Sequence, residues 1–235
     1  MVSTAASYVP TTPFPAAAPQ LELPMVQMLC SRLCHDLAGP AGAVGAGIDL
    51  LSDAAGNDAE ARELVAFGAR QLAARLDFYR IAFGFGGSPQ HFSWAGVRTL
   101  TQRLFEGGRV TAEFTTLAAD GGGEVVPDVF RLALLLILLG AEALPRGGGI
   151  AVGVSRARPG STLPGLTLSV RASGIKASLP DATAAALSGN DDGGTPSRAV
   201  TAVYAARLAQ LLGVSIRMET EAGAITLRVS LPAAA

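Results

Sequence analysis

The 235-residue sequence has no excess of either charge, with 18 basic and 19 acidic side chains and a formal net charge of −1. Proteins that bind nucleic acid or an anionic membrane surface by electrostatics need a basic excess, so we expect neither partner. The longest apolar run, residues 132–144, is too short to span a bilayer, and no cationic segment precedes an apolar stretch at the N-terminus. The sequence therefore predicts a soluble, cytoplasmic protein.

Cysteine is also scarce, and two cysteines cannot make a disulfide framework. Cys30 and Cys34 lie four residues apart on a predicted helix, so their side chains fall on adjacent turns. A metal site would need His35 as a third ligand, but a residue one position away points elsewhere on the helix. We therefore predict no metal site, and interpret the cysteines as reduced thiols packed as small apolar side chains.

The chain divides into three parts by composition and periodicity. Residues 1–20 are rich in Pro, Ala and Thr without a repeat, which predicts a disordered tail. Residues 21–84 contain two helical patterns whose junction lies near residues 52–58. After a Gly/Pro-rich boundary, helix and strand patterns mix over residues 90–235, which predicts a second, α/β domain.

Apolar residues recur at helical spacing through both N-terminal helices, which predicts an antiparallel hairpin. A lone hairpin buries this stripe on one side only, so we predict a homodimer in which two hairpins form a four-helix bundle. The stripe consists of Leu29, Leu33, Leu37, Val44, Ile48 and Leu51 in the first helix and Leu64, Val65, Gly68, Leu72, Leu76, Tyr79 and Phe83 in the second.

His35 is predicted to point away from this stripe. Its neighbours on the same face, Ser31, Gly39 and Gly42, are all small, so a docking protein would find the imidazole accessible. A single exposed histidine is usually only a solvated helix residue. Pro40 weighs against that interpretation, because a proline inside a helix loses a hydrogen bond and bends the axis at a cost of about 3 kcal/mol.

The segment His35-Asp36-Leu37-x-x-Pro40 resembles the H-box of sensor histidine kinases, in which the histidine accepts a phosphoryl group. The longer string LCSRLCHDLAGPAGAVGAGIDLL resembles the ChpT family of histidine phosphotransferases in alphaproteobacteria. The resemblance implies that His35 carries the phosphoryl group. Asp36 then either bonds the second ring nitrogen or is a solvated carboxylate, and the residues alone do not separate these two roles.

In that family the partners are receiver domains that carry an aspartyl phosphate. The resemblance implies a hybrid kinase such as CckA as donor, regulators such as CtrA and CpdR as acceptors, and Mg²⁺ supplied by the receiver. On the second helix, Arg70 and Arg75 either contact an acidic receiver rim or are solvated. The predicted partner-binding residues are Ser31, Arg32, Gly39, Gly42, Arg70 and Arg75.

The C-terminal pattern resembles the ATPase-type α/β sandwich of histidine kinases. It predicts helices at 94–106, 127–144 and 198–213, strands at 109–116, 149–156 and 165–172, and a hairpin at 214–231.

The residues that bind nucleotide in such kinases are missing from this sequence. Leu135 and Leu139 stand where asparagines hold Mg²⁺, and leucine offers no oxygen ligand. Ala172 replaces the aspartate that binds adenine, and Lys176 replaces the second glycine of the same motif, whose first glycine is Gly174. We therefore expect no ATP binding and no cofactor. His91 and the RGGG segment at 146–149 are interpreted as packing and a turn.

A histidine without a working kinase domain must receive its phosphoryl group from another protein. The sequence thus favours a phosphorelay histidine phosphotransferase of the cell-cycle control type. Two alternatives stay open: a divergent active histidine kinase, and an adaptor that binds receivers without chemistry.

Overall fold

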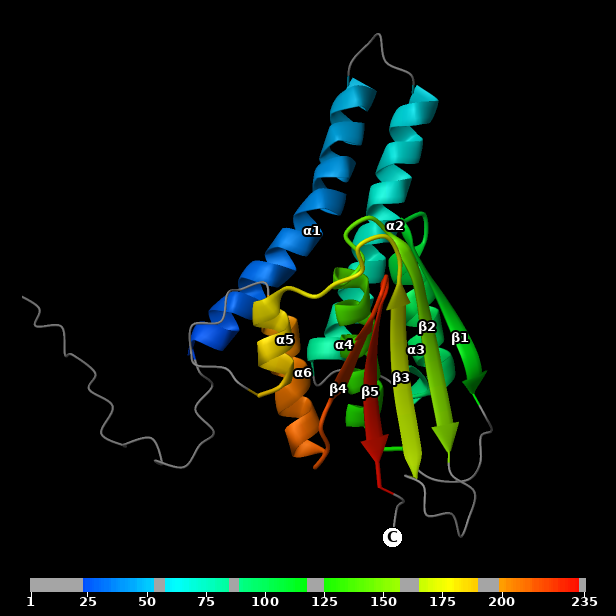
Figure 1. Cartoon of the computed structure of the whole chain (residues 1–235). Coiled ribbons are helices and arrows are strands. Elements are labelled where there is room, and N and C mark those ends of the chain that lie inside the picture. The colour runs from blue at the N-terminus through cyan, green and yellow to red at the C-terminus, as the bar shows by residue number, and fades with distance from the viewer. Residues whose placement is uncertain are drawn as a thin grey trace, which may run out of the picture.

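The computed structural model describes residues 23–52, 58–84, 89–117, 125–156, 165–189 and 199–232. The tail predicted over residues 1–20 lies outside this part of the chain. Within it, the predicted fold class, a helical hairpin followed by an α/β sandwich, is confirmed (Figure 1).

Two long helices form the hairpin: α1 (Leu23–Ser52) and α2 (Asp58–Phe83). Acidic residues in the first turn of α2 and Arg80 in its last turn complement the helix dipole. Pro40 lies inside α1, and Figure 1 shows the lower and upper parts of this helix running in different directions, as the predicted bend requires.

Glycine lets the two helices approach closely at two points. A Cβ atom on Gly68 would lie 2.9 Å from the carbonyl oxygen of Pro40, and one on Gly47 would lie 2.6 Å from Cγ2 of Val65. Both glycines are buried. They are packing residues, unlike Gly39, Gly42 and Gly45, which face open space.

The second part of the chain begins with a short 3₁₀ helix and continues as mixed helices and strands. Ser93 caps the first full helix by accepting a hydrogen bond from the backbone N–H of Gly96. The elements are η1 (Pro89–His91), α3 (Trp94–Phe105), β1 (Val110–Leu117), α4 (Pro127–Glu142), β2 (Gly148–Arg156), β3 (Leu166–Ser173), α5 (Asp181–Leu187), α6 (Val200–Leu211), β4 (Arg217–Glu221) and β5 (Ala224–Leu231).

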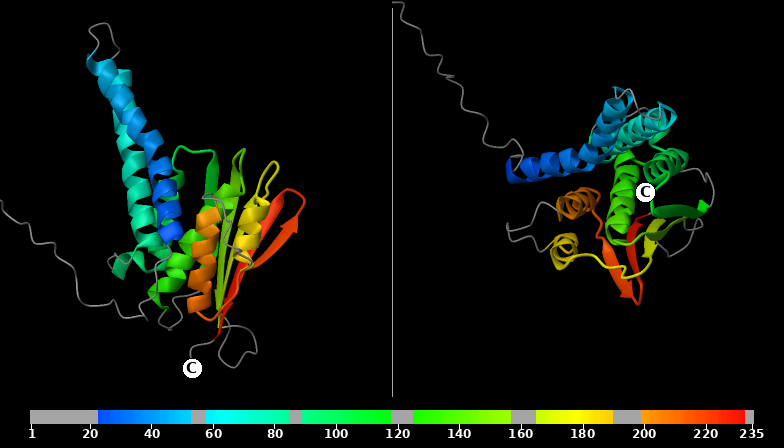
Figure 2. Two further views of the ribbon diagram at one scale, coloured as in Figure 1. Left: turned by 90° about the vertical axis from the view of Figure 1, so that its left-hand side faces the viewer. Right: turned by 90° about the horizontal axis from the view of Figure 1, so that it is seen from above.

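These strands form one five-stranded sheet in the order β1-β2-β3-β5-β4. β1 and β2 are parallel, and every other neighbouring pair is antiparallel. Residues of β3 alternate between buried and less buried, because one face of the sheet is covered and the other is open. Figure 2 shows the helices gathered on the covered face.

Helix α4 is the centre of the core. Residues 132–140 are all buried in it, with Leu135 and Leu139 fully inaccessible. The same core contains Phe78, Ile81 and Ala82 from α2, so it runs across the boundary predicted at residues 84–90. The lower part of the hairpin is therefore packed into the second domain.

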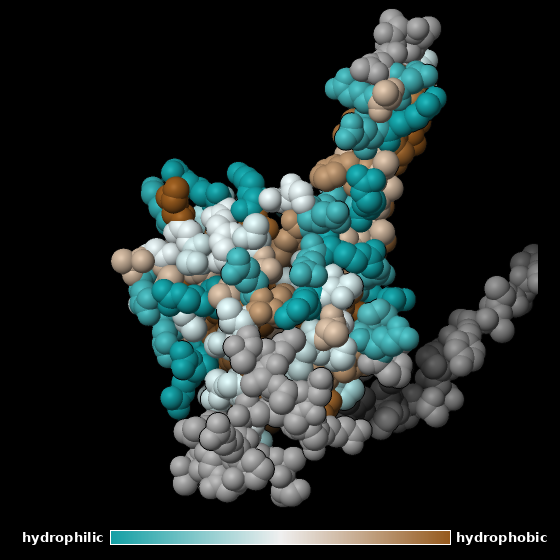
Figure 3. Space-filling view, turned by 90° about the vertical axis from the view of Figure 1, so that its right-hand side faces the viewer, coloured by the Kyte–Doolittle hydropathy of each residue, from teal (hydrophilic) through white to brown (hydrophobic). Residues whose placement is uncertain are grey.

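The upper part of the hairpin projects beyond that core, and Figure 3 shows apolar surface along it. Two members of the predicted stripe in this part, Ile48 and Leu51, are 51% and 37% exposed, and Leu76, farther along α2, is 49% exposed. A single chain thus leaves part of the stripe in solvent.

All the predicted helices and strands of the second part are present, with ends shifted by at most three residues. The sequence interpretation missed α5. Arg146 and Gly147 of the RGGG segment lie in the predicted turn, and Gly148 begins β2. Gly147 adopts a φ of 84°, and a Cβ there would lie 2.4 Å from the carbonyl oxygen of Arg109. Among the described residues, no helix combines the length and the apolar composition needed to cross a membrane.

Candidate functional site

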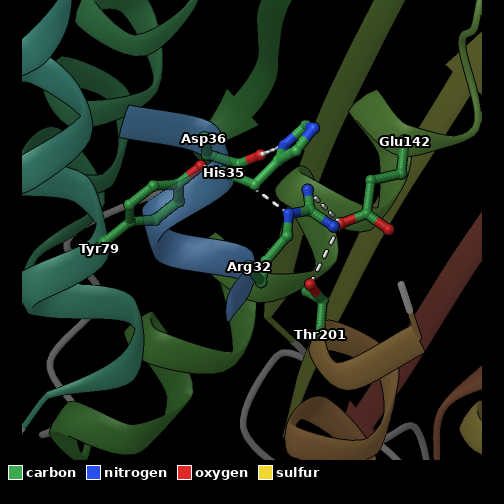
Figure 4. Close-up of polar contacts among 6 residues, drawn as sticks. All are labelled: Arg32, His35, Asp36, Tyr79, Glu142 and Thr201. Carbon is green, nitrogen blue, oxygen red and sulfur yellow. Dashed lines mark hydrogen bonds and ion pairs between the residues drawn. The ribbon is translucent and has the colours of Figure 1, made fainter. Parts of the chain in front are cut away.

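His35 lies on the lower part of α1, and its side chain is 86% exposed, as predicted. Its Nδ1 atom lies 3.2 Å from Oδ1 of Asp36 (Figure 4). A carboxylate accepts hydrogen bonds only, so this contact favours the tautomer with the proton on Nδ1. The Nε2 atom then keeps its lone pair and is the nucleophilic nitrogen.

Asp36 is held by two further hydrogen bonds, both to its other oxygen. Arg32 Nε donates to Oδ2 at 2.6 Å, and the Tyr79 hydroxyl on α2 donates to it at 2.7 Å. Burial alone would raise the pKa of Asp36, but the bonds from Arg32 and Tyr79 outweigh it and lower the pKa below its usual value. Oδ2 is thus fixed by two donors and Oδ1 faces His35, so Asp36 is not the solvated carboxylate of the alternative interpretation.

Arg32 connects this carboxylate to the second domain. Its Nη2 atom lies 3.1 Å from Oε1 of Glu142, near the end of α4. The Thr201 hydroxyl on α6 donates to the same oxygen at 3.1 Å. Burial raises the pKa of Glu142, although Arg32 acts in the opposite direction. Four helices therefore meet in one polar network behind the exposed imidazole (Figure 4).

The hydroxyl of Tyr79 is a permanent donor in this network. Burial first, and then the charge of Asp36 and the hydrogen bond to it, raise the pKa of Tyr79 above its usual value of 10. Tyr79 also packs edge-on against Phe78, with the ring centroids 6.0 Å apart. The hydroxyl stays protonated at physiological pH and keeps donating to Asp36.

The predicted strip around His35 is open. Ser31, Gly39 and Gly42 are exposed, and a Cβ on either glycine would meet nothing within 4 Å. Bulk added here would change the surface without disturbing the packing of the hairpin.

The predicted partner-binding arginines differ in their surroundings. Arg70 is exposed on α2, whereas Arg75 is half-buried and donates from Nη1 to Gln71 at 2.6 Å. Arg32 needs a correction, because its side chain is only 19% exposed and faces Asp36 and Glu142. It acts inside the protein rather than on an open partner-binding surface.

The packing expected of the cysteines was wrong. Cys30 and Cys34 are both exposed, because they lie beside the buried face of α1 rather than on it. Among the residues that the structure describes, no group of three or more His, Cys, Asp or Glu side chains is placed to hold a metal ion. His91 is half-buried in η1, within the boundary segment.

Sequence reasoning did not identify Glu142, Thr201 or the hydroxyl of Tyr79 as parts of the site. Two signals pointed to them. Arg32 precedes Asp36 by four residues, the spacing of an ion pair on one helix. Glu142 is the only charged residue in the apolar run 132–144, and a carboxylate in such a run needs a partner from elsewhere.

The positions compared with a kinase nucleotide site are part of the core. Leu135 and Leu139 are fully buried, and Ala172 is 1% exposed. Gly174 follows it in a tight turn, where a Cβ would lie 2.6 Å from the carbonyl oxygen of Gly147. Lys176 has a left-handed φ of 59°. The side chains of Leu135, Leu139 and Ala172 offer no oxygen or nitrogen to a ligand.

The chain is similar to known proteins both in sequence and in structure. The family model described as the histidine phosphotransferase C-terminal domain matches residues 95–224. Protein phosphotransferase ChpT of Brucella abortus (strain 2308) is 37% identical over 127 residues, which are 53% of this chain and 58% of that relative. The alignment thus spans less than two thirds of the relative's length.

Among solved structures, a bacterial phosphotransferase determined at 1.7 Å aligns with a TM-score of 0.71 and 26% identity, over 89% of this chain and 97% of that chain. The Acinetobacter baumannii histidine kinase AdeS aligns over 86% of this chain and 98% of that chain, with 12% identity and a TM-score of 0.44. Only the first of these alignments is close enough to describe the same fold.

Proposed function

Because the chain belongs to the histidine phosphotransferase family, we propose that it is a phosphorelay histidine phosphotransferase with His35 as the phosphoryl carrier. One observation carries the assignment of the residue. The imidazole is 86% exposed, and its Nδ1 faces a carboxylate that two other donors hold in place. This is the arrangement that a nucleophilic nitrogen presented to a docked protein requires.

The transfer follows from that geometry. The Nε2 lone pair of His35 attacks the phosphorus of an aspartyl phosphate on the receiver, the Nε2–P bond forms and the P–O bond to the receiver carboxylate breaks. The proton stays on Nδ1, so the phosphorylated ring is cationic there. Asp36 stabilises this charge across the 3.2 Å contact. In the second transfer a new receiver carboxylate attacks phosphorus, and the neutral imidazole leaves.

The partners that we propose are the receiver domains of a hybrid histidine kinase and of response regulators, of the CckA, CtrA and CpdR type, in a cytoplasmic cell-cycle relay. The name of the Brucella relative, protein phosphotransferase ChpT, supports this proposal. The receiver would bring the Mg²⁺ that neutralises charge on the transferring group. ATP binding is not expected, since Leu135, Leu139 and Ala172 are apolar and buried.

A homodimer through residues 21–84 is part of the proposal. Five apolar side chains of the hairpin are between 37% and 51% exposed in the single chain, and a second copy would cover them. They are Ile48, Leu50, Leu51, Phe67 and Leu76. Light scattering at micromolar concentration should give the mass of two chains, and a monomer would remove the four-helix bundle.

The decisive experiment supplies a receiver domain phosphorylated on aspartate, with Mg²⁺ and without nucleotide. The protein should acquire acid-labile, base-stable phosphate and then pass it to a second, unphosphorylated receiver. His35→Ala should abolish both steps, because the nucleophilic nitrogen is gone. Glu219→Ala, a change at an exposed residue on β4 that belongs to neither the site nor the predicted partner-binding set, is the control for folding.

Two other results would each support a different function. Labelling from ATP alone would identify an active kinase and overturn the proposal. Receiver binding without any phosphohistidine would identify an adaptor. Phosphotransfer profiling against a panel of purified receivers then identifies the preferred donor and acceptors.

A further inference from the structure

Glu142 is a buried acid whose function a packing argument alone does not explain. It follows the leucine-rich part of α4, and its side chain is 16% exposed. Placing a carboxylate there costs free energy unless it is paired and hydrogen-bonded. It pairs with Arg32 on α1 and accepts a hydrogen bond from Thr201 on α6, and Arg32 belongs to the site around His35.

One guanidinium contacts both carboxylates. Arg32 donates from Nε to Asp36 at 2.6 Å and lies with Nη2 3.1 Å from Glu142. The guanidinium is planar and rigid, so fixing one edge fixes the direction of the other. An arginine paired only with an acid one turn away on the same helix is weakly held. The second domain supplies the additional anchor.

Two hydrogen-bond donors from different helices therefore hold the Asp36 carboxylate. Tyr79 donates to it from α2, and Arg32 donates to it while held by Glu142 from α4. Glu142 is itself fixed by the Thr201 hydroxyl. Without Glu142, Arg32 is free to turn toward solvent and Asp36 loses one of the two donors that orient its carboxylate.

We propose that Glu142 is a positioning residue for the reaction at His35, acting through Arg32 to hold the Asp36 carboxylate against the imidazole. The inference rests on the proposed function. It gives the second domain a part in the chemistry: α4 and α6 complete the site from behind, while the nucleophile stays on the hairpin.

The test is single-turnover transfer from a phosphorylated receiver, measured over a range of receiver concentrations. Glu142→Ala should lower the rate at saturating receiver about tenfold and leave the half-saturating concentration unchanged, because orientation is lost and the docking surface is not. Glu142→Gln keeps an oxygen for Arg32 and Thr201 and should restore most of the rate. The matched control is Glu219→Ala, an exposed acid on β4 paired with Arg228, which should leave transfer unchanged.

A double-mutant cycle tests the route through Arg32. Arg32→Lys keeps the positive charge but cannot bond both carboxylates with a planar fork. If Glu142 acts through Arg32, the combination of Arg32→Lys with Glu142→Ala should be no slower than Arg32→Lys alone. Additive losses, or a change confined to the half-saturating concentration, would overturn the proposal.

The tautomer of His35 gives a readout that needs no partner. At about pH 8.5 a free imidazole is neutral, and ¹⁵N chemical shifts distinguish a proton on Nδ1 from one on Nε2. In the wild type, His35 should carry its proton on Nδ1. Glu142→Ala should shift the tautomer population toward a proton on Nε2. An unchanged population would refute positioning.

This readout also separates the two proposals. If no receiver phosphorylates the wild type, the proposed function fails, while the tautomer still decides whether Glu142 orients the ring. If Glu142→Ala does not fold, Thr201→Val, which removes only the hydroxyl that fixes Glu142, tests the same link and should give a smaller loss of rate and a smaller tautomer shift.

Discussion

The two halves of the hairpin are built from the same helices but are held in different ways. The docked half, residues 23–41 and 68–83, packs into the core of the second domain, where Phe78 and Ile81 are fully buried. The free half, residues 42–52 and 58–67, has only small residues buried, Gly47 and Ala61 among them. Four of its larger apolar side chains, Ile48, Leu50, Leu51 and Phe67, are between 37% and 51% exposed, and Figure 3 shows apolar surface along this half.

The two halves of the hairpin therefore have different roles. The docked half fixes His35 and Asp36 through side chains from α2, α4 and α6. The free half leaves an apolar surface for the proposed second copy, which Leu76 of the docked half extends. The site thus lies where packing is dense enough to fix polar groups, and the proposed dimer surface lies where a single chain cannot bury its own stripe.

The largest expected difference in stability is between alanine substitutions of two phenylalanines on α2. Phe78→Ala, in the docked half, should lower the free energy of unfolding by about 3–5 kcal/mol, because it empties a fully buried site. Phe67→Ala, in the free half and 42% exposed, should cost no more than about 1 kcal/mol. Denaturant unfolding of both variants at one low protein concentration measures the difference. Equal losses would mean that the free half is as tightly packed as the docked half.

A second contrast lies within the free half, between two glycines. A Cβ at Gly47 would lie 2.6 Å from Val65, so Gly47→Ala should cost about 1–2 kcal/mol of stability. A Cβ at Gly45 meets nothing within 4 Å, so Gly45→Ala should add about 0.5–1 kcal/mol by helix propensity. Thermal unfolding should show melting temperatures shifted in opposite directions. Shifts of the same sign would contradict the helix contact at Gly47.

The third prediction concerns the boundary between the halves. Gly42→Leu adds bulk to the open strip beside His35 and should slow transfer about tenfold, equivalent to about 1.4 kcal/mol, by obstructing the receiver. Its stability should rise, because leucine favours helix over glycine. Ala66→Leu, an exposed change on α2, is the control. Unchanged transfer in Gly42→Leu would mean that the receiver approaches another face.

The smallest effect is a dependence of stability on pH in the docked half. The pKa of Asp36 is lowered in the folded protein, so the stabilisation it gives is present above its unfolded value near 3.8 and is lost as pH falls through the folded value. The pKa of Glu142 is raised, so its contribution is lost as pH rises. Relative to wild type, the stability differences of Asp36→Asn and Glu142→Gln should change with pH in opposite directions. Stability differences that change in the same direction with pH would contradict the assigned pKa shifts of Asp36 and Glu142.

Periodicity predicted most of the fold, because helix and strand patterns depend on neighbours in the sequence. The hairpin and every element of the sheet were anticipated, whereas α5 was missed. Its seven residues, DATAAAL, are too short to show an amphipathic repeat. For the site, the exposure of His35 followed from its angle to the apolar stripe, and its place beside Asp36 followed from adjacency alone.

The partners of Asp36 did not follow, because they are remote in sequence. Tyr79 lies 43 residues away, and Thr201 lies 59 residues from Glu142. Arg32 was predicted to bind a partner, whereas its side chain is only 19% exposed. Its burial depends on where α4 meets α1, which no local pattern encodes.

The sequence by itself determined that an exposed histidine would stand on a bent, glycine-rich helix beside an apolar stripe, and that the second domain would lack the nucleotide-binding side chains of a kinase. The first is a property of residue type and helical angle, and the second follows from the resemblance to histidine kinases. Only the tertiary structure decided which groups hold Asp36 and that Glu142 reaches the site from the second domain. Those contacts exist because the core continues from α2 into α4, and packing brings together charges that the chain keeps more than a hundred residues apart.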